Sequence, residues 1–268
     1  MKAQQVKTSW PLMVLLFWAG AVAVSWLLNL EPDAIDLQRI LATPDLHALL
    51  GNDDLGRDIL ARLLTGAQVS LSVAIIVTCI TLSFGTALGL VAGYFGGWVD
   101  RALMHITDVF LAFPGILLAI AFAAVLGPGL NNLILALCLT SWVGYARLTR
   151  AQALSLRNRQ HVLAAESLGA TVPRIMRRHM LPLLAAPLVV EATYSIAGLV
   201  IAEASLSFLG LGIQAPHASW GAMLRDGVRY LLVVPHYVLA VGISLMSLVL
   251  AVNVLGDRLR DAWDVKRT

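Results

Sequence analysis

The sequence predicts an all-α, polytopic membrane protein with six transmembrane helices. Hydrophobic residues make up 59% of its 268 residues and charged residues only 13%, a composition typical of membrane proteins rather than soluble domains. Six stretches hold about 20 mainly apolar residues each, the length that crosses a bilayer. They are residues 11–30, 69–95, 103–126, 130–146, 183–211 and 235–255.

The first stretch is expected to remain as a span. It is too long for the apolar region of a secretory signal and lacks a small-residue cleavage site.

Basic residues in the short loops predict the orientation, because they are enriched on the cytoplasmic side. The interval 147–182 carries arginines against the single Glu166, whereas the loop after the first span is rich in aspartate. We therefore expect both termini and the loop at 147–182 to be cytoplasmic, and segments 31–68 and 212–234 to be external. The whole chain, 1–268, is expected to form one transmembrane domain. The basic residues used are Lys2, Lys7, Arg147, Arg150, Arg157, Arg159, Arg174, Arg177, Arg178, Arg258, Arg260, Lys266 and Arg267.

The polar interval at 163–182 is predicted to be a helical elbow. Gly169 suits the left-handed conformation that closes a helix. Thr171 can cap a second helix with Pro173 in its first turn, where the missing N–H costs nothing. A helical elbow on a membrane surface is expected to dock a partner.

Each external segment is predicted to contain an amphipathic helix. Asp53 or Asp54 can cap the first, whose apolar face is formed by Leu55, Ile59, Leu60 and Leu63, and Ser219 can cap the second, with Trp220 near its start. Such helices either lie in the interface, fold over a pore or pack on the bundle. Small residues at 85, 89 and 93 predict close helix packing.

The sequence carries no catalytic motif that we recognise. Lysine occurs only at Lys2, Lys7 and Lys266, none in a phosphate-binding loop, so the chain is not expected to hydrolyse ATP by that route. The histidines lack metal-ligand spacing, and Cys79 and Cys138 lie in apolar runs, so no metal site is expected.

Three acids fall inside predicted spans, where an unpaired charge is costly. They are Asp108, Glu191 and Glu203, and Phe113-Pro114 is expected to kink the helix that carries Asp108. Either these acids pair with Arg147 or backbone donors to hold the bundle, or they line a translocation path.

Several motifs resemble the permease subunits of ABC importers, in their dipeptide, oligopeptide and nickel branch. Residues 161–182 are similar to the EAA signature and end in the branch's H-x-L-P pattern. Further matching motifs are GNDDLGRD at 51–58, SFLGLG at 207–212 with SWG at 219–221, and GDRLRD at 256–261. The branch's closing Asp-Pro is Asp264-Val265 here, and the amino-terminal tail is short.

The resemblance implies a type I ABC importer permease fold in the bacterial inner membrane. The chain would be the second permease of a heterodimer that works with two ATPase subunits, which bind ATP and Mg, and with an external substrate-binding protein. Its cargo would be di- or oligopeptides, or alternatively nickel, free or chelated. No cofactor is expected in this chain, and no nucleic-acid partner.

The resemblance also assigns roles to residues. ATPase coupling would fall to Ala164, Ala165, Glu166, Gly169, Arg174, Arg177 and Arg178. A path or gate would involve Asp108, Phe113, Pro114, Glu191 and Glu203. The binding protein would contact Asp53, Asp54, Arg57, Asp58 and Trp220. Two rivals remain: a membrane enzyme with Asp108 and Glu191 as an acid pair, and a non-transporting anchor.

Overall fold

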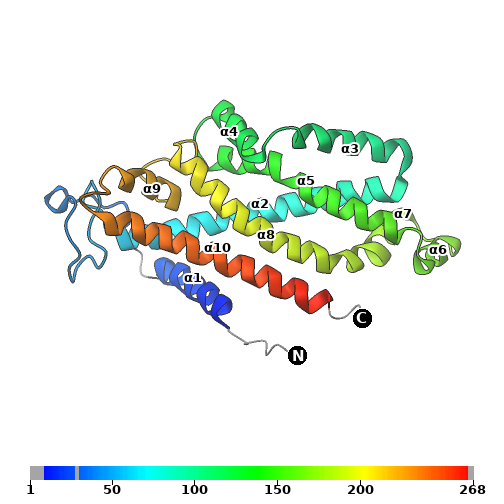
Figure 1. The fold of residues 1–268 in the computed structure, drawn as a ribbon, viewed down its shortest axis with the longest axis horizontal. Helices are drawn as coiled ribbons and strands as arrows, with labels where there is room; N and C mark the ends of the chain where they lie inside the picture. The colour runs from blue at the N-terminus through cyan, green and yellow to red at the C-terminus, as the bar shows by residue number, and fades with distance from the viewer. Residues whose placement is uncertain (1–8, 28–29, 265–268) are drawn as a thin grey trace, which may run out of the picture. The chain divides into compact units, whose positions relative to one another are not determined.

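The computed structural model describes residues 9–27 and 30–264, in which the regular elements are helices and no β-strand occurs (Figure 1). This confirms the predicted all-α class. The helices are α1 (Trp10–Leu27), η1 (Leu37–Arg39), α2 (Ile59–Phe95), α3 (Gly97–Leu111), α4 (Gly115–Leu126), α5 (Leu130–Leu156), α6 (Gln160–Ser167), α7 (Val172–Ile175), η2 (Met176–Met180), α8 (Leu181–Phe208), α9 (Trp220–Val228) and α10 (Pro235–Asp264).

Three helical runs among the described residues are long and apolar enough to cross a membrane: Ile59–Phe95, Val172–Phe208 and Pro235–Trp263. They confirm the spans predicted at 69–95, 183–211 and 235–255. α1 is a shorter apolar helix, and residues 28–29 of the stretch predicted there lie outside the described residues. The stretch 130–146 falls within α5, which is not among the three. The count of six and the positions of the termini stay predictions, and Lys2, Lys7, Lys266 and Arg267 also lie outside the described residues.

The span predicted at 103–126 is broken into α3 and α4, which meet at 84°. The expected kink at Phe113-Pro114 is thus confirmed, but it separates two helices instead of bending one. Pro114 has no N–H to continue the α3 hydrogen bonds and disfavours helical geometry at Phe113. If the bent pair is one span, four helical runs can cross a membrane in the described part of the chain.

The external helix predicted near residue 55 is not a separate element. α2 begins at Ile59 and runs without interruption to Phe95. Its cap is Asp58, whose Oδ1 accepts the backbone N–H of Leu60 at 2.7 Å, so the prediction of Asp53 or Asp54 as the cap was wrong. Gly66 lies within the helix, where a Cβ would fall 3.0 Å from the indole of Trp220.

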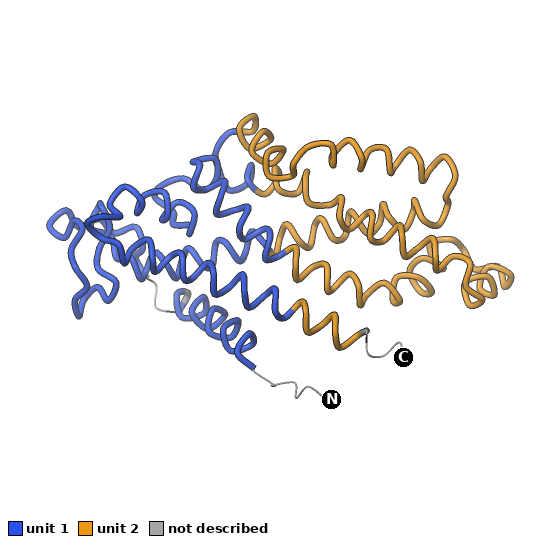
Figure 2. Tube along the Cα trace, in the orientation of Figure 1, with its two compact units in different colours: residues 1–74, 127–133, 196–255 blue, residues 75–126, 134–195, 256–268 orange. Residues whose placement is uncertain are grey.

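The described residues divide into two compact units (Figure 2). The first comprises 1–74, 127–133 and 196–255 and is centred on Trp220, which is fully buried. The Trp220 indole N–H donates to the carbonyl of Leu63 at 3.0 Å, and its ring meets that of Trp18 edge-on at 5.0 Å. Trp18 donates in turn to the hydroxyl of Ser247 in α10. The unit is therefore held by two indoles that are both buried and hydrogen-bonded.

The second unit comprises 75–126, 134–195 and 256–268, and within it α2 packs closely on α5. Gly85, Gly89 and Gly93 lie directly against the α5 backbone. A Cβ at Gly85 would fall 2.5 Å from the carbonyl oxygen of Trp142, and one at Gly89 would fall 2.4 Å from that of Ala146. The prediction that this glycine repeat permits close packing is confirmed.

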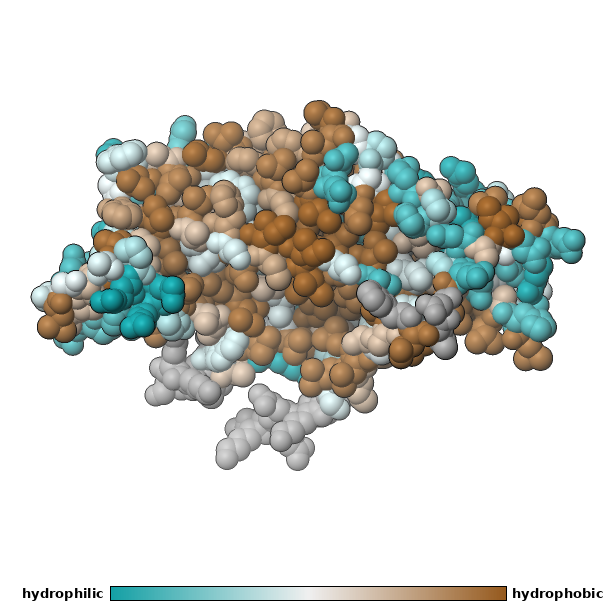
Figure 3. Space-filling model, turned by 180° about the vertical axis from the view of Figure 1, so that it is seen from behind, coloured by the Kyte–Doolittle hydropathy of each residue, from teal (hydrophilic) through white to brown (hydrophobic). Residues whose placement is uncertain are grey.

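The exposed surface is rich in large apolar side chains. The face drawn in Figure 3 is largely hydrophobic. Exposed large apolar residues occur in both units, such as Leu16 in α1, Ile75 in α2 and Ile243 in α10. In water this much exposed apolar surface would be unfavourable, so these helices belong in lipid or against other membrane subunits.

Candidate functional site: a capped helical elbow

The elbow is built from α6, α7 and η2 and leads directly into α8. α6 ends at Ser167 and is closed by Gly169, whose φ of 78° is the left-handed conformation predicted for it. The N–H of Gly169 donates to the carbonyl of Glu166 at 2.9 Å, and that of Ala170 donates to Ala165 at 3.0 Å. This pair of bonds is a Schellman motif, which satisfies carbonyls that a helix end otherwise leaves open. The turn is therefore fixed by the chain's own hydrogen bonds.

The second half of the elbow begins where the sequence predicts. Thr171 occupies the N-cap position of α7, and Pro173 lies in the first turn. The Thr171 side chain, however, accepts no capping hydrogen bond. A wide π turn, Met176–Met180, then carries the helix into α8, with the N–H of Leu181 donating to Met176. The turn widens just before Pro182, which has no N–H to donate to the carbonyl four residues earlier.

One face of the elbow holds it to the rest of the second unit. Val162, Ala165, Ile175 and Met180 are buried in a common apolar cluster with Tyr145 and Leu184. Ala165 therefore anchors the elbow internally, and its predicted role of contacting a partner directly does not fit its burial.

The other face is open. Leu168 is 88% exposed and Leu163 is 47% exposed, and Ala164 and Gly169 are exposed beside them. Glu166, Arg174, Arg177 and Arg178 are exposed as well. An apolar side chain as exposed as Leu168, next to arginines, is typical of a surface that binds another protein.

Two arginines near the end of α5, whose contacts were not predicted, hold α5 to α3 and α2 just before the elbow. Arg150 in α5 binds Asp100 in α3 through two parallel hydrogen bonds of 2.8 and 2.6 Å. Arg157, at the end of α5, donates to the carbonyl of Gly93 at 3.5 Å and lies over Gly96. The only signal in the sequence was their basic charge, which we attributed to orientation in the membrane.

The motif at 51–58, called the outer motif because it lies in a segment predicted to be external, is organised around Asp53, which is completely buried. Its carboxylate accepts from the backbone N–H groups of Leu55 and Arg57 at 2.9 Å and from Nε of Arg57 at 2.7 Å. Nε of Arg62, another buried arginine, lies 3.4 Å from the same carboxylate. Asp53 and Arg57 are thus enclosed by their own chain, which does not fit their predicted contact with a binding protein.

Asp54 is the half-buried carboxyl of this motif, with Oδ1 3.6 Å from the Arg57 guanidinium. Burial, followed by the charge of Asp53, raises its pKa above the usual value. Asp58 caps α2, as described above. Trp220, also assigned to the binding-protein contact, is fully buried.

The three acids predicted within spans have different surroundings. Glu203 is buried in the first unit and accepts from the hydroxyls of Ser70 at 2.6 Å and Ser207 at 2.8 Å, an internal role consistent with holding the bundle. Asp108 is exposed on α3 and Glu191 is half-buried on α8. Within the described residues neither has a hydrogen bond or ion pair, so the pairing with Arg147 is not formed. Phe113, at the break before Pro114, is 57% exposed.

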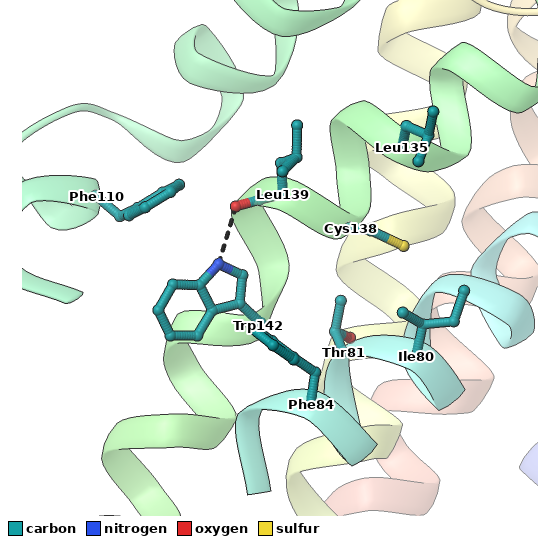
Figure 4. A pocket seen from close by; sticks show the side chains of 8 residues that line it. All are labelled: Ile80, Thr81, Phe84, Phe110, Leu135, Cys138, Leu139 and Trp142. Atoms are coloured by element: carbon teal, nitrogen blue, oxygen red, sulfur yellow. Dashed lines mark hydrogen bonds between the residues drawn. The ribbon is translucent and has the colours of Figure 1, made fainter. Parts of the chain in front are cut away.

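An apolar cavity of about 350 Å³ lies in the second unit (Figure 4). Phe84, Phe110 and Trp142 line it, and the Trp142 indole N–H is already engaged by the carbonyl of Leu139 at 3.0 Å. The cavity has few polar groups, so it is suited to an apolar group such as a hydrocarbon chain. Among the described residues no group of His, Cys, Asp and Glu side chains is placed to hold a metal ion.

Comparisons with known proteins identify the family. Residues 85–265 match the family described as "Binding-protein-dependent transport system inner membrane component". The chain is 43% identical over 226 residues to the dipeptide transport system permease protein DppC of Alkalihalophilus pseudofirmus, covering 84% of this chain and 74% of that protein. It is 41% identical over 264 residues to the glutathione transport system permease protein GsiD of Pectobacterium atrosepticum, covering 98% and 88%.

The fold has a counterpart among solved structures. An inward-facing structure of the MetNI methionine ABC transporter superposes with a TM-score of 0.59 at 23% identity, covering 75% of this chain and 95% of that one. The relatives are transport permeases and not enzymes. This protein belongs to the family of binding-protein-dependent transport system inner membrane components, in the peptide and nickel branch of ABC importer permeases.

Proposed function

We propose that this chain is one permease subunit of an ATP-driven importer of di- and oligopeptides in the bacterial inner membrane. Two relatives that are at least 41% identical transport a dipeptide and glutathione by name, and both cargoes are short peptides. These names favour peptides over nickel, the alternative cargo. The proposed arrangement has six spans, cytoplasmic termini, external segments at 31–68 and 212–234, and the cytoplasmic coupling loop at 147–182.

The observation that carries this proposal is the elbow. Its outer face combines Leu168, 88% exposed, with three exposed arginines, while its inner face is buried in the second unit. A rigid element of this kind can transmit a push from an ATPase subunit to α8, because η2 joins the two without a break. The proposed complex contains a second, homologous permease, two ATPases that bind ATP and Mg, and an external binding protein.

The residues proposed to meet the ATPase are Leu163, Ala164, Leu168 and Gly169, with Glu166, Arg174, Arg177 and Arg178 around them. Leu163 and Leu168 were not assigned in the sequence, since a leucine in an amphipathic helix is ordinarily read as a core residue. Ala165 supports this surface from beneath.

The test is peptide uptake by the purified complex in proteoliposomes. We expect Leu168→Asp to abolish both uptake and the stimulation of ATP hydrolysis by loaded binding protein, with the complex still folded. Leu46→Asp is the matched control, because Leu46 is 95% exposed in an outer segment. Unchanged uptake in the Leu168 variant would contradict the proposal.

A further inference from the structure

A second cavity in the same compact unit as the elbow has a different character from the apolar one. Its volume is about 500 Å³, and its lining comes from α5, α8 and α10. Four of the lining side chains are polar or charged: Gln152, Glu191, Tyr194 and Arg260. Apolar groups, with Trp263 the largest, complete the wall. Cavities of this size and mixture are typical of small-ligand sites.

The acidic side of this cavity has unused acceptors. Glu191 is half-buried and forms no hydrogen bond or ion pair with the described residues. Its carboxylate has room because α5 carries a glycine opposite it, since a Cβ at Gly144 would lie 3.3 Å from Oε1. Pro187 in α8 has no N–H, which leaves the carbonyl of Leu183 without its helical donor. Both Leu183 and Pro187 line the cavity.

The basic side is supplied by α10. Arg260 is exposed and lies within electrostatic reach of the Tyr194 hydroxyl. That hydroxyl donates to Asp257 at 2.6 Å, so toward Arg260 its oxygen can act only as an acceptor. No ion pair joins Arg260 to an acid among the described residues. The α8 wall of the cavity therefore offers a negatively charged acceptor, Glu191, and the α10 wall offers a positively charged donor, Arg260.

A small zwitterion matches this lining. A free ammonium group satisfies the carboxylate of Glu191, and a free carboxylate satisfies the planar donors of Arg260. Gln152 can bond to an amide, and Trp263 with the aliphatic groups can cover a side chain. Glu191 is half-buried, so leaving its charge unpaired is unfavourable and an uncharged ligand would gain less.

We propose that this cavity binds a short peptide with free termini, its ammonium at Glu191 and its carboxylate at Arg260. This rests on the proposed function for the identity of the cargo, and it adds a peptide site within the permease itself. Glu191 lies roughly 15 Å along α8 from Leu181, at about 1.5 Å per residue. On the proposed orientation, the site is thus toward the cytoplasmic end of the span, near the elbow.

The test uses the purified four-subunit complex in lipid nanodiscs, without binding protein, and radiolabelled dialanine as the probe. We expect measurable dialanine binding that Glu191→Gln and Arg260→Gln each weaken about tenfold or more, since each removes a charged hydrogen bond. The matched controls are Glu31→Gln and Arg101→Gln, which neutralise exposed charges elsewhere and are expected to bind as the unaltered complex does. Thermal unfolding of every variant verifies that the fold is retained.

Blocked peptides assign each terminus to its residue. N-acetyl-dialanine should bind weakly and be insensitive to Glu191→Gln, and dialanine amide should be insensitive to Arg260→Gln. If both substitutions weaken blocked and free peptides equally, or if dialanine does not bind, the peptide site is wrong.

Failure of this site is distinguishable from failure of the proposed function. If the complex imports dialanine with its binding protein but does not bind dialanine without it, the proposed function holds and the proposed peptide site is wrong. If the binding protein retains dialanine but the complex imports none, the proposed function is wrong. The cavity is then not a site for cargo.

Discussion

The outer motif at 51–58 and the elbow at 163–182 are both charged segments between apolar helices, yet they use their charges in opposite ways. In the outer motif Asp53 and Arg57 are buried and bonded to each other. In the elbow Arg174, Arg177 and Arg178 are exposed. Charged residues that satisfy one another stabilise a loop, whereas charges left open are available to a partner.

The glycines of the two segments show the same contrast, and they give the largest expected effect. Gly56 and Gly169 both have positive φ, 74° and 78°, but a Cβ at Gly56 would lie 1.8 Å from the backbone oxygen of Asp36. We expect Gly56→Ala to prevent stable folding, because that oxygen cannot move away freely. Gly169→Ala has nothing within 4 Å and should cost only about 1–2 kcal/mol of left-handed strain. Thermal unfolding in detergent compares the two, and equal losses would refute the distinction.

The buried carboxylate of the outer motif gives the next largest effect. Asp53→Ala leaves the guanidinium groups of Arg57 and Arg62 without their shared acceptor, and both are buried. We expect a loss of about 3–5 kcal/mol in the free energy of unfolding. Glu31→Ala, an exposed acid of the same segment, should change it by less than about 0.5 kcal/mol. A loss at Asp53 no larger than the control would show that the outer motif is not held by this cluster.

Removing the elbow's charge should leave stability almost unchanged and reduce function. Replacing Arg174, Arg177 and Arg178 together with Gln is expected to shift the free energy of unfolding by less than about 0.5 kcal/mol per residue, since all three are exposed. Stimulation of ATP hydrolysis by loaded binding protein should fall, because the partner loses its charged contacts. A triple variant that is destabilised but still fully coupled would reverse the assignment.

The smallest expected effect concerns pH in the outer motif. Because burial raises the pKa of Asp54, the folded chain holds that proton more tightly than the unfolded chain does. The buried, charged Asp54 carboxylate therefore lowers stability above the raised pKa. This destabilisation is relieved as the pH falls through the raised pKa toward the usual value of 3.8. Asp54→Asn should remove that part of the pH dependence, seen as the difference between two unfolding series from pH 4 to 7. An unchanged pH profile would contradict the assignment.

Local signals in the sequence were sufficient for several parts of this fold. The closure of α6 at Gly169, the break at Pro114 and the cap at Ser219, which accepts the N–H of Ala222 at 3.2 Å, each depend on residues within one or two turns. The glycine repeat of α2 likewise required only its spacing. Each of these features depends on local backbone geometry, which glycine, proline and capping residues indicate directly in the sequence.

Other features depend on contacts between distant residues and were not predictable. No neighbouring residue in the sequence marks Arg62 as buried, but it lies beside the carbonyl oxygens of Pro32 and Pro216, 30 and 154 positions away. Trp220 was expected at a surface and is buried against Leu63 and Trp18. In the elbow, Ala165 faces inward because it packs in an apolar cluster with residues from α2, α5 and α8.

The central claim, that the elbow docks an ATPase subunit, is tested most directly by cross-linking from Leu168. A photoreactive benzoylphenylalanine at position 168 in the assembled complex, irradiated in the membrane, should yield a product with the mass of this chain plus one ATPase subunit. The same group at position 46, which is 95% exposed in the segment predicted to be external, should give no such product. Cross-links from position 168 only to lipid or to this chain itself would contradict the claim.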